Sequence, residues 1–565
     1  MSSTLFHGSV LDVGAEAGGM SVHTDVWLRI DAAGFIDYLG GEKPHSHDDD
    51  DDAERGSVVE LGPDQMLMPG FIDTHVHAAQ VQYTGTGTDL PLMQWLEKYA
   101  FPSERRLGTD LVLARGVYGD LADTFLRNGT TTVQYFGVLS LASTKLLVDV
   151  LVERGQRAFV GKVAMDRLAP DDYLETAAEG VARTEQFIEY TRQRSPVAVP
   201  IVRGEGGVGG TAGAGNAGGA DTRPLPLVEP VITPRFVPCC TETLLAGLGE
   251  LAARLDCAVQ SHAVESVDCL ATVEWLHPGR DEVEILHEAG LLTRRTVMAH
   301  SVHITEPQVQ VFASTGTGIA HCPLSNFYFA GGALRCAALM PRVKIGLGTD
   351  VAGGYSPRMI DSVRHAVTTH LAVASADANE QQRVAEAGKE KEKEKTEEER
   401  GTEKECETGN EREREQEKEG EEAGEKGKEQ EKEEKKEDET TQTIAVVQAQ
   451  ESAGSPDAEV RASRARRVRC EGVAPGAGNP MDRDAFDYKH AVWLATVGGA
   501  RCLGLEGRVG RLEVGYAFDA CLVDLAGFRA DEPLTRFEKY VHLGDDRHIR
   551  QVWVQGRDVT PPPAG

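Results

Sequence analysis

The chain has 565 residues, enough for two or three ordinary domains, and 40% of them are hydrophobic, which permits a sizeable core. Its formal net charge of −31 argues against general nucleic-acid binding, because that function requires a basic surface. No apolar run reaches the roughly 18 residues of a membrane helix, and the first residues lack the pattern of a secretory signal. We therefore expect a cytoplasmic protein.

The first segment, residues 1–67, alternates apolar and polar side chains in short runs such as Val26–Ile30 and Val58–Leu61. A period of two, interrupted by Gly and Asp, predicts antiparallel strands of a small sheet. The last segment, 509–565, has the same pattern, for example at Ala520–Val523.

Residues 68–375 alternate strand-like runs with longer helical patterns. Helices are expected near Leu111–Asn128, closed by Gly129, and near Glu242–Arg254. This alternation predicts the α/β class and a (β/α)8, TIM-like barrel.

Three segments interrupt the pattern. His45–Gly56 is acidic, residues 204–226 are rich in Gly and Ala, and residues 376–480 are dominated by Glu and Lys. None can bury enough apolar surface to offset its chain entropy, so we predict disordered insertions. Glu and Lys four residues apart could instead form a solvated helix in the third segment.

Polar residues that suit metal chemistry follow several apolar runs. His75 and His77 end one run, and their side chains point the same way in an extended segment. Later runs end at His262, with Glu265 three residues on, at His300 and at Asp350. Any one of these could be an ordinary structural residue. Together they fit a barrel, whose chemistry gathers at the C-terminal ends of the strands.

These motifs carry a resemblance. PGFIDTHVH, SHAVE, MAH and GTD, in that order, resemble the single-metal deaminase branch of the amidohydrolase superfamily. HAAQ, TDLPLMQWLEKYAFPSE, RNGTTT, TPRF, HCPLSNF and YVHLGDDRHI narrow the resemblance to the guanine deaminase family. It covers most of residues 1–375 and 481–565. It implies a homodimer, a final barrel helix at 481–508, and a β-sandwich that unites 1–67 with 509–565.

The resemblance implies a metal held by three imidazole nitrogens and one carboxylate oxygen. Such ligands suit Zn²⁺, and Fe²⁺ is compatible with the same types. The metal would activate a water molecule for attack. The implied metal ligands are His75, His77, His262 and Asp350.

The implied catalytic residues are Glu265 as a proton shuttle, Asp350 as the base for the water, and His300 as a hydrogen-bonding partner of that water. Each has a plainer alternative: Glu265 could be a surface residue, and His300 a structural histidine.

Substrate contacts are implied as well. Arg235 would bind the purine carbonyl, Phe236 would pack on the ring, and Gln80 would read its edge. The alternative for the first two is an arginine–carboxylate pair beside a core phenylalanine. Trp95 and Leu96 would form an apolar wall, or equally a helix core. The metal-side residues expected to share in substrate contact are His77, His262, Glu265 and Asp350.

The predicted function is hydrolytic deamination of guanine to xanthine and ammonia, in purine catabolism. One alternative is the same chemistry on another purine, a pterin or a triazine. Another is a non-catalytic scaffold whose charged insertion binds other proteins.

Overall fold

A computed structural model of the chain describes residues 3–44, 57–198, 224–422 and 486–562. The chain divides into two compact units, one formed by Met1–Ser375 with Glu471–Gly565 and the other by Ala376–Cys470. The first unit holds the barrel and a sheet built from both chain ends.

The predicted TIM-like barrel is confirmed. Within the described residues, eight strands of one sheet pair with their neighbours in parallel. A short ninth strand, β9 (Val163–Ala164), also pairs in parallel with β12. Nearly every residue of these strands is buried, as expected for strands covered on both faces. The barrel strands are β6 (Phe71–His77), β7 (Thr130–Phe136), β8 (Arg157–Gly161), β12 (Val228–Pro234), β13 (Ala258–Ala263), β14 (Thr296–His300), β15 (Gly318–His321) and β16 (Lys344–Leu347).

The ring closes between its first and last strands. The Thr74 hydroxyl donates to the Leu347 carbonyl at 2.8 Å, and the Asp350 amide donates to the His75 carbonyl at 2.9 Å. The buried Asp73 carboxylate accepts from the Thr349 hydroxyl at 2.5 Å and from the Thr349 amide at 3.1 Å. These contacts place the end of β6 directly beside the residue that follows β16.

The helices predicted from the sequence are confirmed. Helix α3 begins after Asp110, whose side chain accepts from the Leu113 amide, and ends before Gly129, which adopts a φ of 76°. No helix in the described ranges has both the length and the apolar character to cross a membrane. The main barrel helices are α2 (Phe101–Thr109), α3 (Leu111–Arg127), α4 (Leu141–Arg154), α5 (Ala177–Arg194), α6 (Glu242–Leu255), α7 (Val267–Leu276), α8 (Glu282–Glu288) and α9 (Glu306–Thr315).

Shorter helical segments lie at the strand ends and after the insertion. The segment expected to supply the final barrel helix, residues 481–508, contains three consecutive helical pieces from Tyr488 onward. The shorter segments are α1 (Leu92–Trp95), α10 (Pro323–Ser325), α11 (Cys336–Leu339), α14 (Tyr488–Trp493) and α15 (Gly499–Cys502), with π-helical turns η2 (Leu96–Ala100), η5 (Asn326–Ala330) and η7 (Leu494–Gly498).

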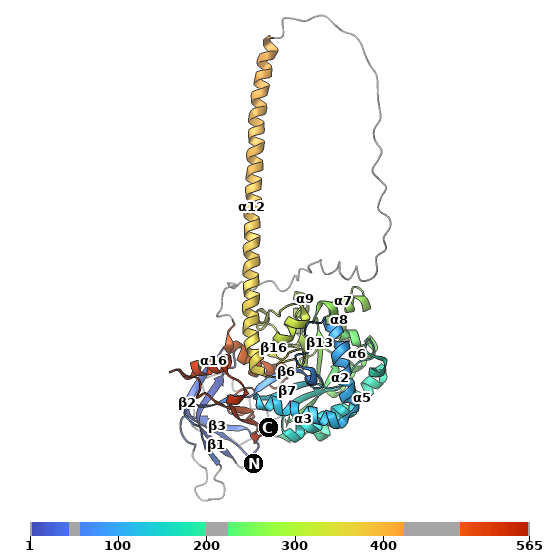
Figure 1. The fold of residues 1–565 in the computed structure, drawn as a ribbon, viewed down its shortest axis with the longest axis vertical. Coiled ribbons are helices and arrows are strands. Elements are labelled where there is room, and N and C mark those ends of the chain that lie inside the picture. Colours follow the sequence, from blue (N-terminus) through green and yellow to red (C-terminus); the bar gives the residue numbers. More distant parts are fainter. Residues whose placement is uncertain (1–2, 45–56, 199–223, 423–485, 563–565) are drawn as a thin grey trace. The chain divides into compact units, whose positions relative to one another are not determined.

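A second sheet joins the two ends of the chain, as predicted. In the described segments its strands run in the order β19-β18-β17-β5-β1-β2-β3, with β4 paired to β1. Figure 1 shows β1, β2 and β3 together at one side of the barrel, near the C-terminal helix α16 (Pro533–Leu543). The strands are β1 (Thr4–Val13), β2 (Met20–Ile30), β3 (Ile36–Gly40), β4 (Ser57–Glu60), β5 (Gln65–Pro69), β17 (Ala520–Asp524), β18 (Ile549–Val554) and β19 (Arg557–Asp558).

The segments predicted as insertions are only partly described. Helix α12 runs without interruption from Met359 to Glu422, so the first part of the Glu/Lys-rich segment takes the helical alternative that the sequence left open. Glu and Lys side chains four residues apart favour such a helix. The rest of the predicted insertion, 423–480, lies outside the described residues. So do 45–56 and most of the Gly-rich segment, 204–223.

Candidate active site

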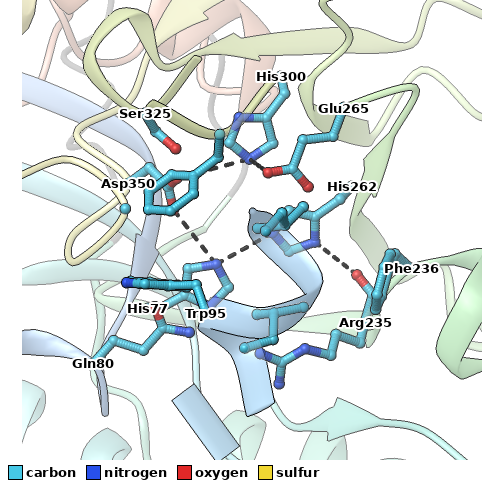
Figure 2. Close-up of a pocket in the computed structure, with 14 residues that line it drawn as sticks. His77, Gln80, Trp95, Arg235, Phe236, His262, Glu265, His300, Ser325 and Asp350 are labelled. Atoms are coloured by element: carbon cyan, nitrogen blue, oxygen red, sulfur yellow. Dashed lines mark hydrogen bonds and ion pairs between the residues drawn. The ribbon is translucent and has the colours of Figure 1, made fainter. Parts of the chain in front are cut away.

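A pocket lies at the C-terminal ends of the barrel strands (Figure 2). The structure brings the sequence-predicted residues together here, and His75 lies next to the pocket in contact with Asp350. The lining residues are His77, Gln80, Leu92, Trp95, Leu96, Arg235, Phe236, His262, Glu265, His300, Ser325, Phe329, Asp350 and Gly353.

Two imidazoles face each other across the pocket. His77 at the end of β6 and His262 on β13 place their Nε2 atoms 3.2 Å apart. The Nδ1 atom of His262 lies 2.7 Å from the Arg235 carbonyl, which can only accept a hydrogen bond. The Nδ1 atom of His262 is therefore protonated, so in the neutral ring its Nε2 offers a lone pair. A lone pair aimed at another imidazole nitrogen is the arrangement that a bound cation stabilises.

Asp350 completes this cluster. Its Oδ1 atom lies 3.1 Å from Nε2 of His75 and 3.5 Å from Nε2 of His77. The Nε2 atom of His75 is buried and has no hydrogen-bond partner. Potential ligand atoms of His75, His77 and Asp350 lie within 4.8 Å of one another, as do those of His75, His262 and His300. An orphaned nitrogen among converging donors fits a divalent metal ion.

Burial keeps the histidines in the form that binds metals. It lowers the pKa of His75, His77 and His262 well below the usual value of 6.5, and the neighbouring imidazoles lower it further. Neutral imidazole is the ligating form, so these side chains need not lose a proton before a metal binds at neutral pH.

Glu265 and His300 form the opposite wall of the pocket. Oε1 of Glu265 lies 3.4 Å from Nε2 of His300, which in turn lies 3.8 Å from Oδ2 of Asp350. Burial, followed by the charge of Asp350, raises the pKa of Glu265 well above its usual range. A glutamate whose pKa is raised in this way is better suited to act as an acid in this position.

The backbone is strained where the strands end. Val264, His300 and Asp350 adopt φ values of 45°, 67° and 49°, a left-handed conformation that is rare for residues other than glycine. Each such residue costs on the order of 1–3 kcal/mol, and strain of this kind concentrates at functional sites. The turn at Val264 directs Glu265 back toward the pocket that His262 lines.

Arg235 is paired with a carboxylate, which is the alternative that the sequence left open. Its Nη1 and Nη2 atoms donate to Oε2 and Oε1 of Glu104 at 2.6 and 2.9 Å. Burial by itself would lower the pKa of the Arg235 guanidinium. The charge and the hydrogen bonds of Glu104 outweigh burial, so the pKa is raised. Arg235 nevertheless lines the pocket, so the ion pair and a substrate contact are compatible.

Apolar side chains form the remaining wall. The ring centroids of Trp95 and Phe329 lie 4.8 Å apart, and the Trp95 indole donates to the Thr86 carbonyl at 3.0 Å. The wall expected from Trp95 and Leu96 is thus shared with Phe329, which the sequence did not identify.

Sequence reasoning missed several residues of the site. Ser325 lines the pocket and hydrogen-bonds to Asp350, whose pKa burial raises and this bond lowers. Gly353 allows a close approach, since a Cβ there would lie 2.6 Å from Oδ2 of Asp350. Glu104 had the one usable signal, because it lies three residues from both Phe101 and Leu107 and so shares their face of α2.

Comparison with known proteins agrees with the geometry. The amidohydrolase family model matches residues 66–387 and 471–559. Guanine deaminase of Mus musculus is 31% identical over 89% of this chain and 85% of its own length. The chain belongs to the guanine deaminase family of amidohydrolases. Another member of this guanine deaminase family, from Dictyostelium discoideum, is 28% identical over 98% of both chains.

Solved structures support the fold. A guanine deaminase from C. acetobutylicum, with guanine bound in its active site, matches 99% of this chain and 100% of its own at a TM-score of 0.68. The identity of 23% makes this a comparison of folds, and it places the guanine deaminase barrel in the same arrangement.

Proposed function

We propose that this protein is a guanine deaminase, which hydrolyses guanine to xanthine and ammonia. The observation that carries the proposal is the match to guanine deaminases along nearly the full length of both chains, in a protein whose predicted site residues converge on one pocket. Membership of the family supports the substrate and the reaction class together.

We propose that His75, His77, His262 and Asp350 hold one divalent metal ion. The support is the convergence of His75, His77 and Asp350, the distance of 3.2 Å between the Nε2 atoms of His77 and His262, and the Nε2 atom of His75 that has no hydrogen-bond partner. Zn²⁺ is our first choice, because nitrogen and carboxylate ligands suit it, and Fe²⁺ accepts the same set. When bound, such a metal lowers the pKa of a coordinated water and so supplies a nucleophile at neutral pH.

The protein's own groups then move the protons. Asp350 takes a proton from the attacking water, and His300 accepts a hydrogen bond from that water and orients it. Glu265 gives its proton to the ring nitrogen beside C2 of guanine, so negative charge does not build up on the ring. The oxygen of the water adds to C2, Asp350 passes its proton to the amino group, and the C2–N bond breaks to release ammonia. The remaining hydroxyl proton returns to Glu265 as the carbonyl of xanthine forms.

Substrate recognition is assigned to the other end of the pocket. Arg235 donates to the purine carbonyl, Phe236 and Trp95 pack on the faces of the ring, and Leu96 completes the apolar wall. Gln80 reads the ring edge. The metal-side residues His77, His262, Glu265 and Asp350 contact the part of the ring that reacts.

A turnover assay combined with metal analysis tests this proposal. Ammonia release from guanine should far exceed release from adenine, cytosine and 8-oxoguanine, and activity should follow metal content. No ammonia from guanine with a full complement of metal would refute the assignment. Removing the metal with a chelator and restoring Zn²⁺ or Fe²⁺ separately identifies the ion.

The remaining expectations are a homodimer, a cytoplasmic location and a role in purine catabolism. The dimer and the role in purine catabolism rest on the family resemblance. Sedimentation of the purified protein tests the dimer, and fractionation of its cells tests the location. The scaffold alternative would require a protein that is inactive with metal bound.

A further inference from the structure

One buried carboxylate, Glu104 on α2, accepts four hydrogen bonds at the recognition end of the pocket. Arg235 occupies both oxygens at 2.6 and 2.9 Å. The amide of Gln80 donates to Oε1 at 3.0 Å, and the hydroxyl of Tyr173 donates to Oε2 at 3.0 Å. Glu104 is 1% exposed, so it is shielded from water, and within the described part of the chain these donors satisfy both of its oxygens.

The direction of each of these bonds is determined. A carboxylate paired with a guanidinium accepts hydrogen bonds and cannot donate them. The Tyr173 oxygen already accepts from the Leu139 amide at 3.3 Å, so its own proton is directed at Glu104. Gln80 must therefore turn its NH₂ group toward Glu104, which fixes the orientation of an amide that could otherwise flip.

This orientation leaves the oxygen of Gln80 without a partner. Gln80 is 1% exposed and lines the pocket, and its Oε1 atom is buried with no hydrogen bond. Figure 2 shows its amide and the Arg235 guanidinium at the same end of the pocket, away from Glu265 and His300. A buried, unsatisfied acceptor costs on the order of 1–3 kcal/mol, which a ligand that donates a hydrogen bond would recover.

We propose that Glu104 is the positioning residue that sets the hydrogen-bonding polarity of the pocket. It holds Arg235 as a donor and Gln80 as an acceptor. The pocket therefore selects heterocycles that present a carbonyl to Arg235 and a ring N–H to Gln80. This inference rests on the proposed function, since guanine carries both groups, and it assigns Glu104 no contact with the substrate.

Glu104→Gln tests the inference with a side chain of nearly the same shape. The new NH₂ group would oppose the donors of Arg235 and Gln80. We expect KM for guanine to rise about 10²-fold while kcat changes less than about tenfold, because the metal-side groups remain in place. Glu104→Asp keeps the charge and should recover most of the affinity. An unchanged KM in a folded Glu104→Gln protein would overturn the proposal.

A double-mutant cycle asks whether Glu104 acts through Gln80. Gln80→Ala should raise KM clearly in the wild-type background but less than about twofold in the Glu104→Gln background, because the amide is no longer oriented there. An equal effect of Gln80→Ala in both backgrounds would mean that the two residues act independently, which contradicts the proposal.

If Glu104→Gln does not fold, the binding of guanine analogues to the wild-type protein provides a second test. In these analogues each ring N–H is replaced in turn by C–H, which keeps the shape of the ring. At least one should bind about 10²-fold or more weakly, because it leaves Gln80 unpaired. Equal binding of all analogues overturns the inference. Failure of the wild-type protein to release ammonia from guanine would instead refute the proposed function.

Discussion

Glu265 shows how one side chain acquires its chemistry from its surroundings. The sequence places it three residues after His262, with a surface residue as the plainer alternative. In the folded chain it is 5% exposed, and burial with the nearby charge of Asp350 raises its pKa. A carboxyl group whose pKa is raised by its surroundings is suited to donate a proton to a ring nitrogen.

Replacing Glu265 by Gln should therefore separate catalysis from metal binding. The variant should keep its full metal content, because Glu265 is outside the proposed ligand set, and should lose about 10²–10⁴-fold in kcat. Metal analysis beside a steady-state assay measures both quantities. A rate equal to that of the wild type would remove Glu265 from the mechanism.

A buried histidine outside the proposed ligand set offers a test of the burial argument itself. Burial, and then the neighbouring His300, lowers the pKa of His321 to about 3. Below the unperturbed pKa of 6.5, the unfolded chain therefore binds more protons at His321 than the folded chain does. The free energy of unfolding is consequently larger above that pH and decreases as the pH falls.

When the pH is lowered from about 7 to about 5, the titration of His321 should decrease the unfolding free energy of the metal-free protein by about 2 kcal/mol. Buried carboxyl groups with raised pKa values titrate in the opposite direction, so the comparison must be made against His321→Gln. Urea unfolding of both metal-free proteins at both pH values isolates the difference. Equal losses in the two proteins would contradict the assigned pKa.

At the scale of elements, strand ends and their connections build the site. The fold and the metal-side residues were predictable, because apolar runs ending in His or Asp mark barrel strands and their C-terminal ends. The hydrogen bonds that join β6 to the end of β16, which we call the seam, were not predictable. Thr74, Asp73 and Thr349 look like ordinary residues in the sequence. Their partners lie more than 270 residues away along the chain, as in the Thr74–Leu347 bond, where the separation is 273.

Thr349→Val tests the contribution of this seam. The change removes the hydroxyl that donates to the buried Asp73 carboxylate at 2.5 Å while keeping the shape of the side chain. We expect a loss of about 1–3 kcal/mol in unfolding free energy, because a buried oxygen of Asp73 is left without a donor. Thr349→Ser retains the hydroxyl and is the matched control. Denaturation curves that do not distinguish Val from Ser would show that the bond is unimportant.

At the scale of the whole molecule, one buried ion pair ties the barrel to the second sheet. Arg157 at the start of β8 donates to both oxygens of Asp519, before β17, at 2.6 and 3.0 Å, and both side chains are 2% exposed. Arg157→Ala should cost about 3–5 kcal/mol, because it leaves a buried carboxylate unpaired.

The surface pair of Arg115 and Glu153 is the control for this prediction. Its donor and acceptor are 2.9 Å apart but its side chains are 50% and 43% exposed. Arg115→Ala should therefore change stability by about 1 kcal/mol or less. Chemical denaturation of both variants measures the contrast, and similar losses would contradict the role of burial.

The charged insertion offers a second prediction at this scale. The proposed metal ligands and catalytic residues all precede residue 381, and the described residues after 486 return to the first unit. Deleting 381–470 should therefore leave guanine turnover near normal. Thermal unfolding confirms whether the shortened protein is folded. Loss of activity in a folded deletion protein would assign the insertion a part in catalysis.

The sequence by itself determined the barrel, the family and the residues that converge around the metal site, because short apolar runs and their terminal residues are local patterns. Only the tertiary structure revealed Glu104, Ser325 and the Asp73–Thr349 seam, because each depends on which distant side chain lies opposite. The same holds for the polarity of the pocket. Arg235 and Gln80 can be identified from motifs, but in the proposed arrangement the Glu104 carboxylate on α2 decides which of their atoms is left for the substrate.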